Sequence, residues 1–212
     1  MAVKHDPSRP LAPSLEALAL LALTLPLALW LHEPSLWFLV PFALITLRRR
    51  DYADYGLDLS QRRRWGGLWF HLLNLALLAL YAAGHLLFAR WWLGSRFALT
   101  APQSPHMLLF SQLLGVALPE EFFFRGYLQS QLNRTLGQRT GVLGVRCGLG
   151  LPLAALLFAL CHIPLGGPAQ VIVIFPGLWY GWLRERTDSV VIPTVYHALS
   201  NVLLKTILVS LS

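Results

Sequence analysis

Two adjacent carboxylates, Glu120 and Glu121, lie with Arg125 in the stretch LPEEFFFRG, which is otherwise apolar. An ionisable side chain at bilayer depth costs about 2.5 to 3.5 kcal/mol on insertion scales, so such groups are functional candidates. Glu121 and Arg125 are four residues apart and share a helix face, which predicts an ion pair that reduces the cost of burying both. Glu120 is rotated by about 100° from Glu121 and lacks this partner. It is therefore the carboxylate that is available for chemistry.

The alternative is that this cluster is a cytoplasmic helix end whose charged groups reach water. However, three phenylalanines follow the glutamates directly, and apolar residues continue to Leu132. A solvated helix end would not carry such a sequence, so we favour a site embedded in the membrane. Pro119 removes one backbone hydrogen bond beside Glu120 and predicts a bend in the helix there.

Two further motifs carry polar side chains in apolar surroundings. His162 closes the stretch FALCH, and His197 and Asn201 in HALSN are four residues apart, which places both on one helix face. Each motif alone is as common in structural packing as in a site. Counted at 1.5 Å per residue, Glu120 and His197 come to a similar depth in the membrane, and helix tilt must bring His162 to them.

The composition indicates that these groups lie on membrane helices. The chain is 56% hydrophobic and 13% charged, whereas a soluble domain is roughly 25% charged. With a mean hydropathy of +0.56, residues 1–212 are predicted to form a single integral membrane domain. The net charge is +7, and the basic residues are clustered in short loops between apolar segments. This pattern indicates membrane topology rather than nucleic-acid binding.

Seven apolar segments predict an all-α polytopic membrane bundle of about seven transmembrane helices around a polar cavity, which is expected to open toward the cytoplasmic half. The segments are 14–31, 36–47, 67–88, 106–132, 149–162, 169–183 and 189–211. A spanning helix needs roughly 20 apolar residues. The second, fifth and sixth segments are shorter than this, so the number of spans stays open by one.

The orientation follows from two arginine triplets, 48–50 and 62–64, that bracket a polar loop. By the positive-inside rule this loop is cytoplasmic. Alternation from there also places most of the other basic residues inside, namely Lys4, Arg9, Arg134, Arg139, Arg146, Arg184 and Arg186. The N-terminus is therefore predicted to be cytoplasmic, in a multi-pass protein of a prokaryotic cell (inner) membrane.

Taken together and in order, the stretches EEFFFR, FALCH and HALSN resemble the motifs of the CPBP family (CAAX protease and bacteriocin-processing, also called Abi) of intramembrane proteases. This family includes the CAAX prenyl endopeptidases, and the resemblance covers residues 108–204. It implies a glutamic-type intramembrane endopeptidase that hydrolyses a peptide bond near the membrane-embedded or C-terminal part of a protein or peptide substrate.

The resemblance also implies a role for each matching residue. Glu120 would be the general base that activates water, and His162 would hold or polarise that water. His197 and Asn201 would donate hydrogen bonds to the oxyanion of the tetrahedral intermediate. The Glu121–Arg125 pair would brace the first carboxylate.

Several alternatives stay open at this stage. A glutamate with two histidines can make a zinc site, but the chain has no His-Glu-x-x-His helix and asparagine is a poor zinc ligand. We therefore expect no metal and no cofactor, with a zinc-dependent version of the same protease as the alternative.

Other functional classes are a proton- or ion-coupled transporter and a non-catalytic maturation or immunity chaperone. The expected partners are the lipid bilayer and a membrane protein or peptide substrate. Eukaryotic relatives remove the last three residues of prenylated proteins, and prokaryotic relatives are linked to peptide maturation, immunity to self-made bacteriocins and C-terminal sorting signals. By resemblance, we favour a protease of C-terminal sorting signals. The oligomeric state is not predicted.

Overall fold

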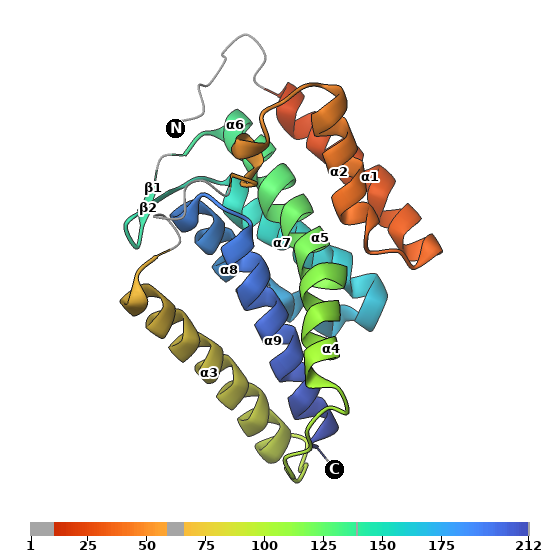
Figure 1. Cartoon of the computed structure of the whole chain (residues 1–212), viewed down its shortest axis with the longest axis vertical. Coiled ribbons are helices and arrows are strands. Elements are labelled where there is room, and N and C mark those ends of the chain that lie inside the picture. The colour runs from red at the N-terminus through yellow and green to blue at the C-terminus, as the bar shows by residue number, and fades with distance from the viewer. Residues whose placement is uncertain (1–10, 59–65, 139, 212) are drawn as a thin grey trace.

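The computed structural model describes residues 11–58, 66–138 and 140–211. Within these ranges the chain is almost entirely helical, which confirms the all-α class (Figure 1). One short antiparallel hairpin, β1 (Thr140–Val142) and β2 (Val145–Cys147), departs from this prediction. It forms in a glycine-rich connection because Gly144, with φ of 77°, takes the left-handed conformation that the tight turn requires.

The helices lie where the seven apolar segments were predicted. They are α1 (Ala12–Leu31), α2 (Leu36–Leu47), α3 (Leu68–Trp91), a continuous helical rod from Pro105 to Leu136, α7 (Gly150–Gly166), α8 (Ile174–Thr187) and α9 (Val191–Val209), with short 3₁₀ turns η1 (Tyr52–Tyr55) and η5 (Pro168–Val173). Among the described residues, four of these are long and apolar enough to cross a membrane: α1, α3, the rod and α9. The three segments predicted to be short form the short helices α2, α7 and α8, so seven complete spans are not confirmed.

The rod that carries the two glutamates is not a regular α-helix. It consists of α4 (Pro105–Phe110), η3 (Ser111–Ala117), α5 (Leu118–Glu121), η4 (Phe122–Leu128) and α6 (Gln129–Leu136), of which η3 and η4 are π-helical. Pro119 lies in α5 and has no N–H to donate to the helix ladder. π-Helical turns are rare in proteins, and those that occur are frequently found at functional sites. The irregular winding around the glutamates therefore indicates a functional site in this part of the rod.

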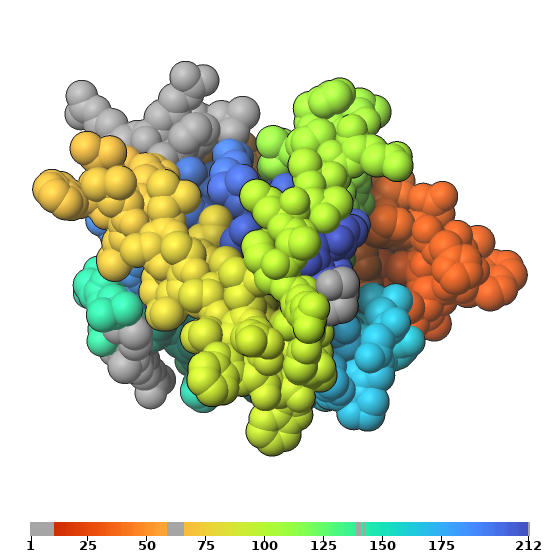
Figure 2. Space-filling view, turned by 90° about the horizontal axis from the view of Figure 1, so that it is seen from below, coloured from red at the N-terminus to blue at the C-terminus, as the bar shows by residue number. Residues whose placement is uncertain are grey.

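The rod lies at the centre of the bundle, next to α9 (Figure 1). The α1–α2 pair packs on one side of it, α7 and α8 pack against each other behind it, and α3 contacts α9 at the periphery. In the space-filling view, α3 and the α1–α2 pair form opposite flanks of the molecule (Figure 2). The part of the rod that holds Glu120, α5, contacts α2 and α9.

The phenylalanines that follow the glutamates join the rod to its neighbours. Phe122, Phe123 and Phe124 are all buried. The ring centroid of Phe123 lies 4.7 Å from that of Trp37 in α2, and the centroid of Phe124 lies 5.1 Å from that of Phe158 in α7. Aromatic pairs of this kind contribute about 0.5 to 1.5 kcal/mol beyond their buried area. They also exclude water from one side of the acidic motif.

A polar cluster ties the α1–α2 pair to the rod at the end that carries the arginines. The Glu16 carboxylate accepts hydrogen bonds from Arg48, from Arg50 and from the hydroxyl of Tyr127. The hydrogen bond to Glu16 raises the pKa of Arg50 further above its usual value, so this arginine stays charged at any physiological pH. Lys4, Arg9, Arg139 and the second arginine triplet, also used to predict the orientation, lie outside the described residues.

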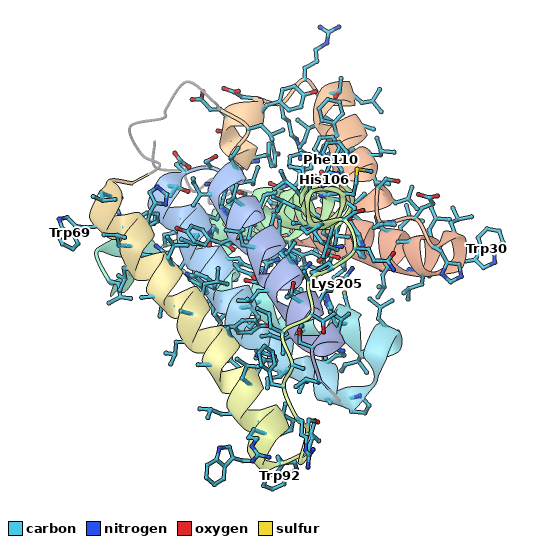
Figure 3. All side chains as sticks on the ribbon, turned by 60° about the horizontal axis from the view of Figure 1, so that its bottom comes forward. Trp30, Trp69, Trp92, His106, Phe110 and Lys205 are labelled. Atoms are coloured by element: carbon cyan, nitrogen blue, oxygen red, sulfur yellow. The ribbon has the colours of Figure 1, made fainter. Side chains whose placement is uncertain are left out.

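Exposed tryptophans mark both ends of the apolar surface. Trp69 is 82% exposed at the start of α3, and Trp92 is 80% exposed just after its end (Figure 3). Trp30, at the end of α1, is 78% exposed and projects from the bundle in the same view. Tryptophan is enriched at the two membrane–water interfaces. These positions therefore indicate that α3 spans the apolar layer from one interface to the other.

Candidate active site

Glu120 lies at the wall of a cavity of about 630 Å³. The cavity is bounded by α1, α2, the rod and α7, and His162 of α7 lines it as well. The Glu120 side chain is 13% exposed. Its Oε2 atom is buried and has no hydrogen-bond partner among the described residues. Since buried polar atoms are nearly always hydrogen-bonded, an oxygen without a partner is unusual at such a place.

Glu121, the next residue, is fully buried and has several partners. Its Oε1 atom lies 3.2 Å from Arg125 Nη1, so the ion pair predicted from the spacing is present. The same oxygen accepts a hydrogen bond of 2.8 Å from the Nδ1–H of His197. This second contact joins residues 76 positions apart and has no local signal in the sequence.

Arg125 is held by aromatic rings as well as by Glu121. Its guanidinium carbon lies 4.2 Å from the ring centroid of Phe158 and 5.6 Å from that of Tyr180, distances within cation–π range. Its Nη2 donates to the carbonyl of Gly177 at 3.3 Å. Because the arginine is only 1% exposed, these contacts replace the water that the charge would otherwise bind.

His197 of α9 lies between the two glutamates. A carboxylate can only accept, so Nδ1 carries the hydrogen shared with Glu121, and Nε2 is the nitrogen that faces Glu120. The distance from Nε2 to Glu120 Oε2 is 3.8 Å. The imidazole also stacks on Tyr180, with ring centroids 4.9 Å apart and planes 16° from parallel. These contacts fix the plane of the ring relative to the Glu120 carboxylate.

His162 and Asn201 are held by single hydrogen bonds. His162 Nδ1–H donates to the backbone carbonyl of Phe158 at 2.8 Å, which leaves Nε2 of the neutral ring as an acceptor. Asn201 Nδ2 donates to Gln112 Oε1 at 3.1 Å. Gln112, a buried amide on the rod, was missed by the sequence analysis because an isolated glutamine has no recognisable motif.

The structure brings some of the predicted site residues together more closely than others. Glu120 is the common member: it shares the cavity with His162 and approaches His197. His197 and Asn201 are not among the residues that line the cavity. They lie on α9, beyond Glu120 as seen from the cavity.

The mouth of this cavity corrects one prediction. Its exposed lining residues are His32 and Pro34, in the loop between α1 and α2, and Pro164 and Leu165, near the end of α7. The loop of Arg48 to Arg50 lies at the opposite end of the α1–α2 pair. The expected opening toward the arginine-rich, cytoplasmic half is therefore wrong, because the loop that joins α1 to α2 forms the rim.

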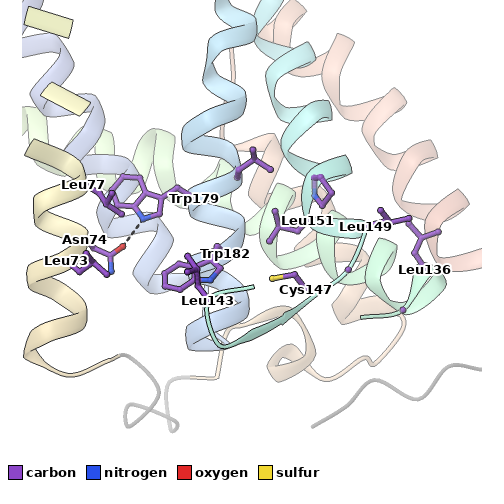
Figure 4. A pocket seen from close by; sticks show the side chains of 14 residues that line it. Leu73, Asn74, Leu77, Leu136, Leu143, Cys147, Leu149, Leu151, Trp179 and Trp182 are labelled. Atoms are coloured by element: carbon purple, nitrogen blue, oxygen red, sulfur yellow. Dashed lines mark hydrogen bonds between the residues drawn. The ribbon is translucent and has the colours of Figure 1, made fainter. Parts of the chain in front are cut away.

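A second cavity, of about 760 Å³, lies between α3, the β-hairpin, α7 and α8 (Figure 4). Its lining is mostly leucine and tryptophan, and the Trp179 indole N–H donates to Asn74 Oδ1 at 2.8 Å across it. None of the predicted site residues lines it. This cavity is larger than the one beside Glu120, but its lining includes no carboxylate or histidine, so we do not assign the chemistry to it.

The predicted zinc alternative can be tested against the side chains. Within the ranges that the structure describes, no three His, Cys, Asp or Glu side chains are grouped closely enough to hold a metal ion. Glu120 and His197 approach each other, and His197 binds Glu121 through Nδ1. No third ligand is grouped with this pair in the described residues, and a metal-free site stays a prediction.

Comparison with known families agrees with the motifs. Residues 102–203 match the family model described as type II CAAX prenyl endopeptidase Rce1-like. These residues belong to the CAAX protease family. The matched range contains the glutamate pair and both histidine motifs. The chain matches no curated protein and no solved structure.

Membership has two consequences at the level of the family. The family consists of proteases, and the reaction of such a family is peptide-bond hydrolysis. The apolar helices place the protein in a membrane. The matched range begins just before the rod and ends within α9, so α1, α2 and α3 lie outside it.

Proposed function

We propose that this chain is an intramembrane endopeptidase in which Glu120 activates a water molecule without a metal ion. One observation carries the proposal. The unpartnered carboxylate oxygen of Glu120 is buried beside a cavity that it shares with His162, and it lies 3.8 Å from His197. The three side chains come from three different helices, and all three lie within residues 102–203, which match the family model.

The water would be oriented by two acceptors. The Glu120 carboxylate accepts hydrogen bonds, and so does Nε2 of His162, because its Nδ1–H is donated to the Phe158 carbonyl. A water that donates one hydrogen to each directs a lone pair at the substrate carbonyl. As the new C–O bond forms, the proton between water and Glu120 moves to the carboxylate, which is general base catalysis.

The negative charge that develops on the carbonyl oxygen would be stabilised from α9. With Nδ1–H bound to Glu121, His197 donates from Nε2 when the ring is an imidazolium. Asn201 has a second amide hydrogen in addition to the one bound to Gln112. Preorganised donors of this kind in a site that excludes water usually contribute the largest share of the catalysis.

In the second step Glu120 returns its proton to the amide nitrogen as the C–N bond breaks. The amine then leaves, and the carboxylate is ready to bind the next water.

Glu120→Gln tests the proposal directly. General acid–base catalysis contributes about 10² to 10⁴-fold, so kcat should fall by about 10³-fold. The substrate is a quenched fluorescent peptide ending in a farnesylated Cys-aliphatic-aliphatic-X sequence, chosen because the family model names CAAX substrates. Glu33→Gln, in the exposed α1–α2 loop, is the matched control and should leave kcat unchanged.

A second readout covers the case in which this peptide is not a substrate. Cells that express the wild-type protein and the Glu120→Gln variant are compared for membrane proteins that retain uncleaved C-terminal tails. Full cleavage by the variant, or identical tails in both cells together with an uncleaved peptide, would contradict the proposal.

A further inference from the structure

We propose that the larger cavity, between α3, the β-hairpin, α7 and α8, binds one anionic phospholipid. An acyl chain would fill the apolar part of the cavity, and the phosphate group would lie beside Arg186 at one end of it. The lipid would belong to the leaflet on the side of the arginine-rich loops. This site is separate from the glutamate pair, and the inference does not depend on the proposed function.

The lining of this cavity suits an alkyl chain better than water. Leucine, tryptophan, glycine and proline make up most of it (Figure 4). The amide side chain in the lining, that of Asn74, is satisfied within the protein: Oδ1 accepts from the Trp179 indole at 2.8 Å, and Nδ2 donates to the Phe70 carbonyl at 2.7 Å. Ordered water needs polar partners that are still free, and apolar cavities stay dry. The volume of about 760 Å³ lies in the range of roughly 300 to 1,000 Å³ that is usual for ligand sites.

The position of the cavity along α3 places it within one leaflet. Trp69, 82% exposed at the start of α3, marks a membrane interface (Figure 3). The lining residues Leu73 and Leu77 follow it by four and eight residues, which is about 6 and about 12 Å along the helix axis. Half of a hydrocarbon core is about 15 Å thick. Both leucines are exposed, so the cavity is open to the lipid chains of this leaflet.

The leaflet is the one on the arginine-rich side of the bundle. Arg184, near the end of α8, donates to the Asp54 carbonyl in η1, and η1 directly follows Arg48 to Arg50. The start of α3 lies at the same end, because the ring of Phe70 stacks on that of Trp182 in α8, with centroids 6.1 Å apart. Basic residues at a membrane surface attract anionic lipid head groups.

Arg186 supplies a positive charge at the interface end of the cavity. It follows the lining residue Trp182 by four positions, so both share a face of α8. Its guanidinium carbon lies 5.8 Å from the ring centroid of Phe70, which precedes the lining residue Asn74 by one turn of α3. The side chain is exposed, and none of the ion pairs in the described part of the chain involves it. Arg186 therefore lies one turn beyond the apolar lining on both helices.

The acidic residue next to Arg186 does not oppose an anionic ligand there. The Glu185 carboxylate accepts hydrogen bonds of 2.6 Å from three amide side chains, those of Gln129, Asn133 and Gln138. These amides belong to α6 and the residues just after it. The negative charge is therefore held against the rod, whereas the guanidinium of Arg186 is exposed.

The two features together specify the ligand. A guanidinium binds phosphate oxygens through two parallel N–H groups. A phospholipid satisfies Arg186 and the apolar lining at once, because its phosphate lies at the interface and its chain reaches into one leaflet. A head group with a net negative charge is favoured over a zwitterionic one by about fivefold for each arginine near the surface.

Native mass spectrometry tests the site without any assay of activity. The whole chain in detergent is mixed with equal amounts of phosphatidylglycerol and phosphatidylcholine that carry the same acyl chains. The wild type should retain one phosphatidylglycerol, with a preference of about fivefold over phosphatidylcholine. Arg186→Gln should remove this preference. Leu77→Trp, which fills the cavity from α3, should lose the retention of both lipids.

Two matched variants control for diffuse charge and for added bulk. Arg49→Gln removes another exposed arginine at the same end of the bundle, and Leu80→Trp adds a ring on an exposed position of α3 that does not line the cavity. Both should retain lipid as the wild type does. Equal retention of the two lipids by the wild type, or an equal loss of preference in Arg49→Gln, would refute a specific anionic site. Retention that survives in Leu77→Trp would place the lipid elsewhere and overturn the proposal.

A competition experiment distinguishes a resident lipid from another apolar occupant. The farnesylated peptide, which also carries a long alkyl chain, is added to the protein loaded with phosphatidylglycerol. The bound lipid should stay. Displacement of the lipid in proportion to the added peptide would show that the cavity receives the prenyl group of that peptide, and the proposal would then be wrong.

Discussion

The buried Glu121–Arg125 pair makes a quantitative prediction that separates stability from catalysis. The two side chains are 0% and 1% exposed, so removing one charge leaves the other buried without compensation. Arg125→Met should therefore cost about 3 to 5 kcal/mol in the free energy of unfolding. In a chain of this size, each kcal/mol of lost stability lowers the melting temperature by about 2 to 4 °C, so we expect a fall of about 10 °C.

The double variant Glu121→Gln/Arg125→Met should recover most of this loss. It removes both charges, and the glutamine oxygen can still accept the hydrogen bond from His197 Nδ1. The wild-type pair is itself incompletely bonded, because Glu121 Oε2 and Arg125 Nη1 have no hydrogen-bond partner among the described residues. The double variant should therefore unfold within about 1 kcal/mol of the wild type.

Catalysis should not recover with stability. In the double variant a neutral amide replaces the carboxylate that accepts the hydrogen bond from His197 Nδ1, so the ring is polarised less, stabilisation of the oxyanion weakens and kcat should stay about 10²-fold below that of the wild type. Melting is followed by the intrinsic fluorescence of the tryptophans in detergent, and cleavage by the farnesylated peptide. The stability losses of the single variants Glu121→Gln and Arg125→Met are compared with that of the double variant. If the two single losses add up to the loss of the double variant, the coupling between the two charges is refuted.

Three further predictions follow from the same contacts. Metal chelators should leave peptide cleavage unchanged, and loss of activity that zinc restores would show that Glu120 is not a metal-free base. Gln112→Leu, which removes the acceptor that orients Asn201, should lower kcat about tenfold with a melting temperature close to that of the wild type, and an unchanged kcat would contradict this role. Burial, and then the nearby charge of Glu185, raise the pKa of the Cys147 thiol above its ordinary value of 9.0, so thiolate is scarce at neutral pH. Alkylation in a Cys161→Ser background should accelerate as the pH rises beyond 9 and should be faster at pH 8 in Glu185→Gln, whereas a rate that is already constant below pH 9 would exclude a raised pKa.

Local spacing was enough to predict much of the site. The four-residue interval between Glu121 and Arg125 fixed their shared face, and the 100° rotation left Glu120 free of the ion pair. Hydrophobic runs likewise predicted all seven helical segments. These features depend only on residues close together along the chain, and helical periodicity determines them without knowledge of the fold.

Contacts between distant segments could not be predicted in the same way. Two hydrogen bonds join the rod to α9, which follows about 80 residues later. They run from His197 to Glu121 and from Asn201 to Gln112. The predicted opening of the cavity was wrong for the same reason. Counting residues along a helix gives the position of a residue along the membrane normal. Which loops and which aromatic rings border the cavity depends on the packing between helices.

The difference between the two adjacent glutamates follows from the position of the rod between two unlike environments. One side of the rod faces α8 and α9, where Arg125, His197 and aromatic rings surround Glu121. The other side faces the cavity between α1, α2 and α7, which Glu120 lines, and Glu120 Oε2 makes no hydrogen bond to the described residues. Since a helix turns by about 100° per residue, neighbouring carboxylates necessarily point in different directions. The same sequence element therefore supplies a fixed carboxylate that holds the histidine and, one residue earlier, the carboxylate that we propose takes a proton from water.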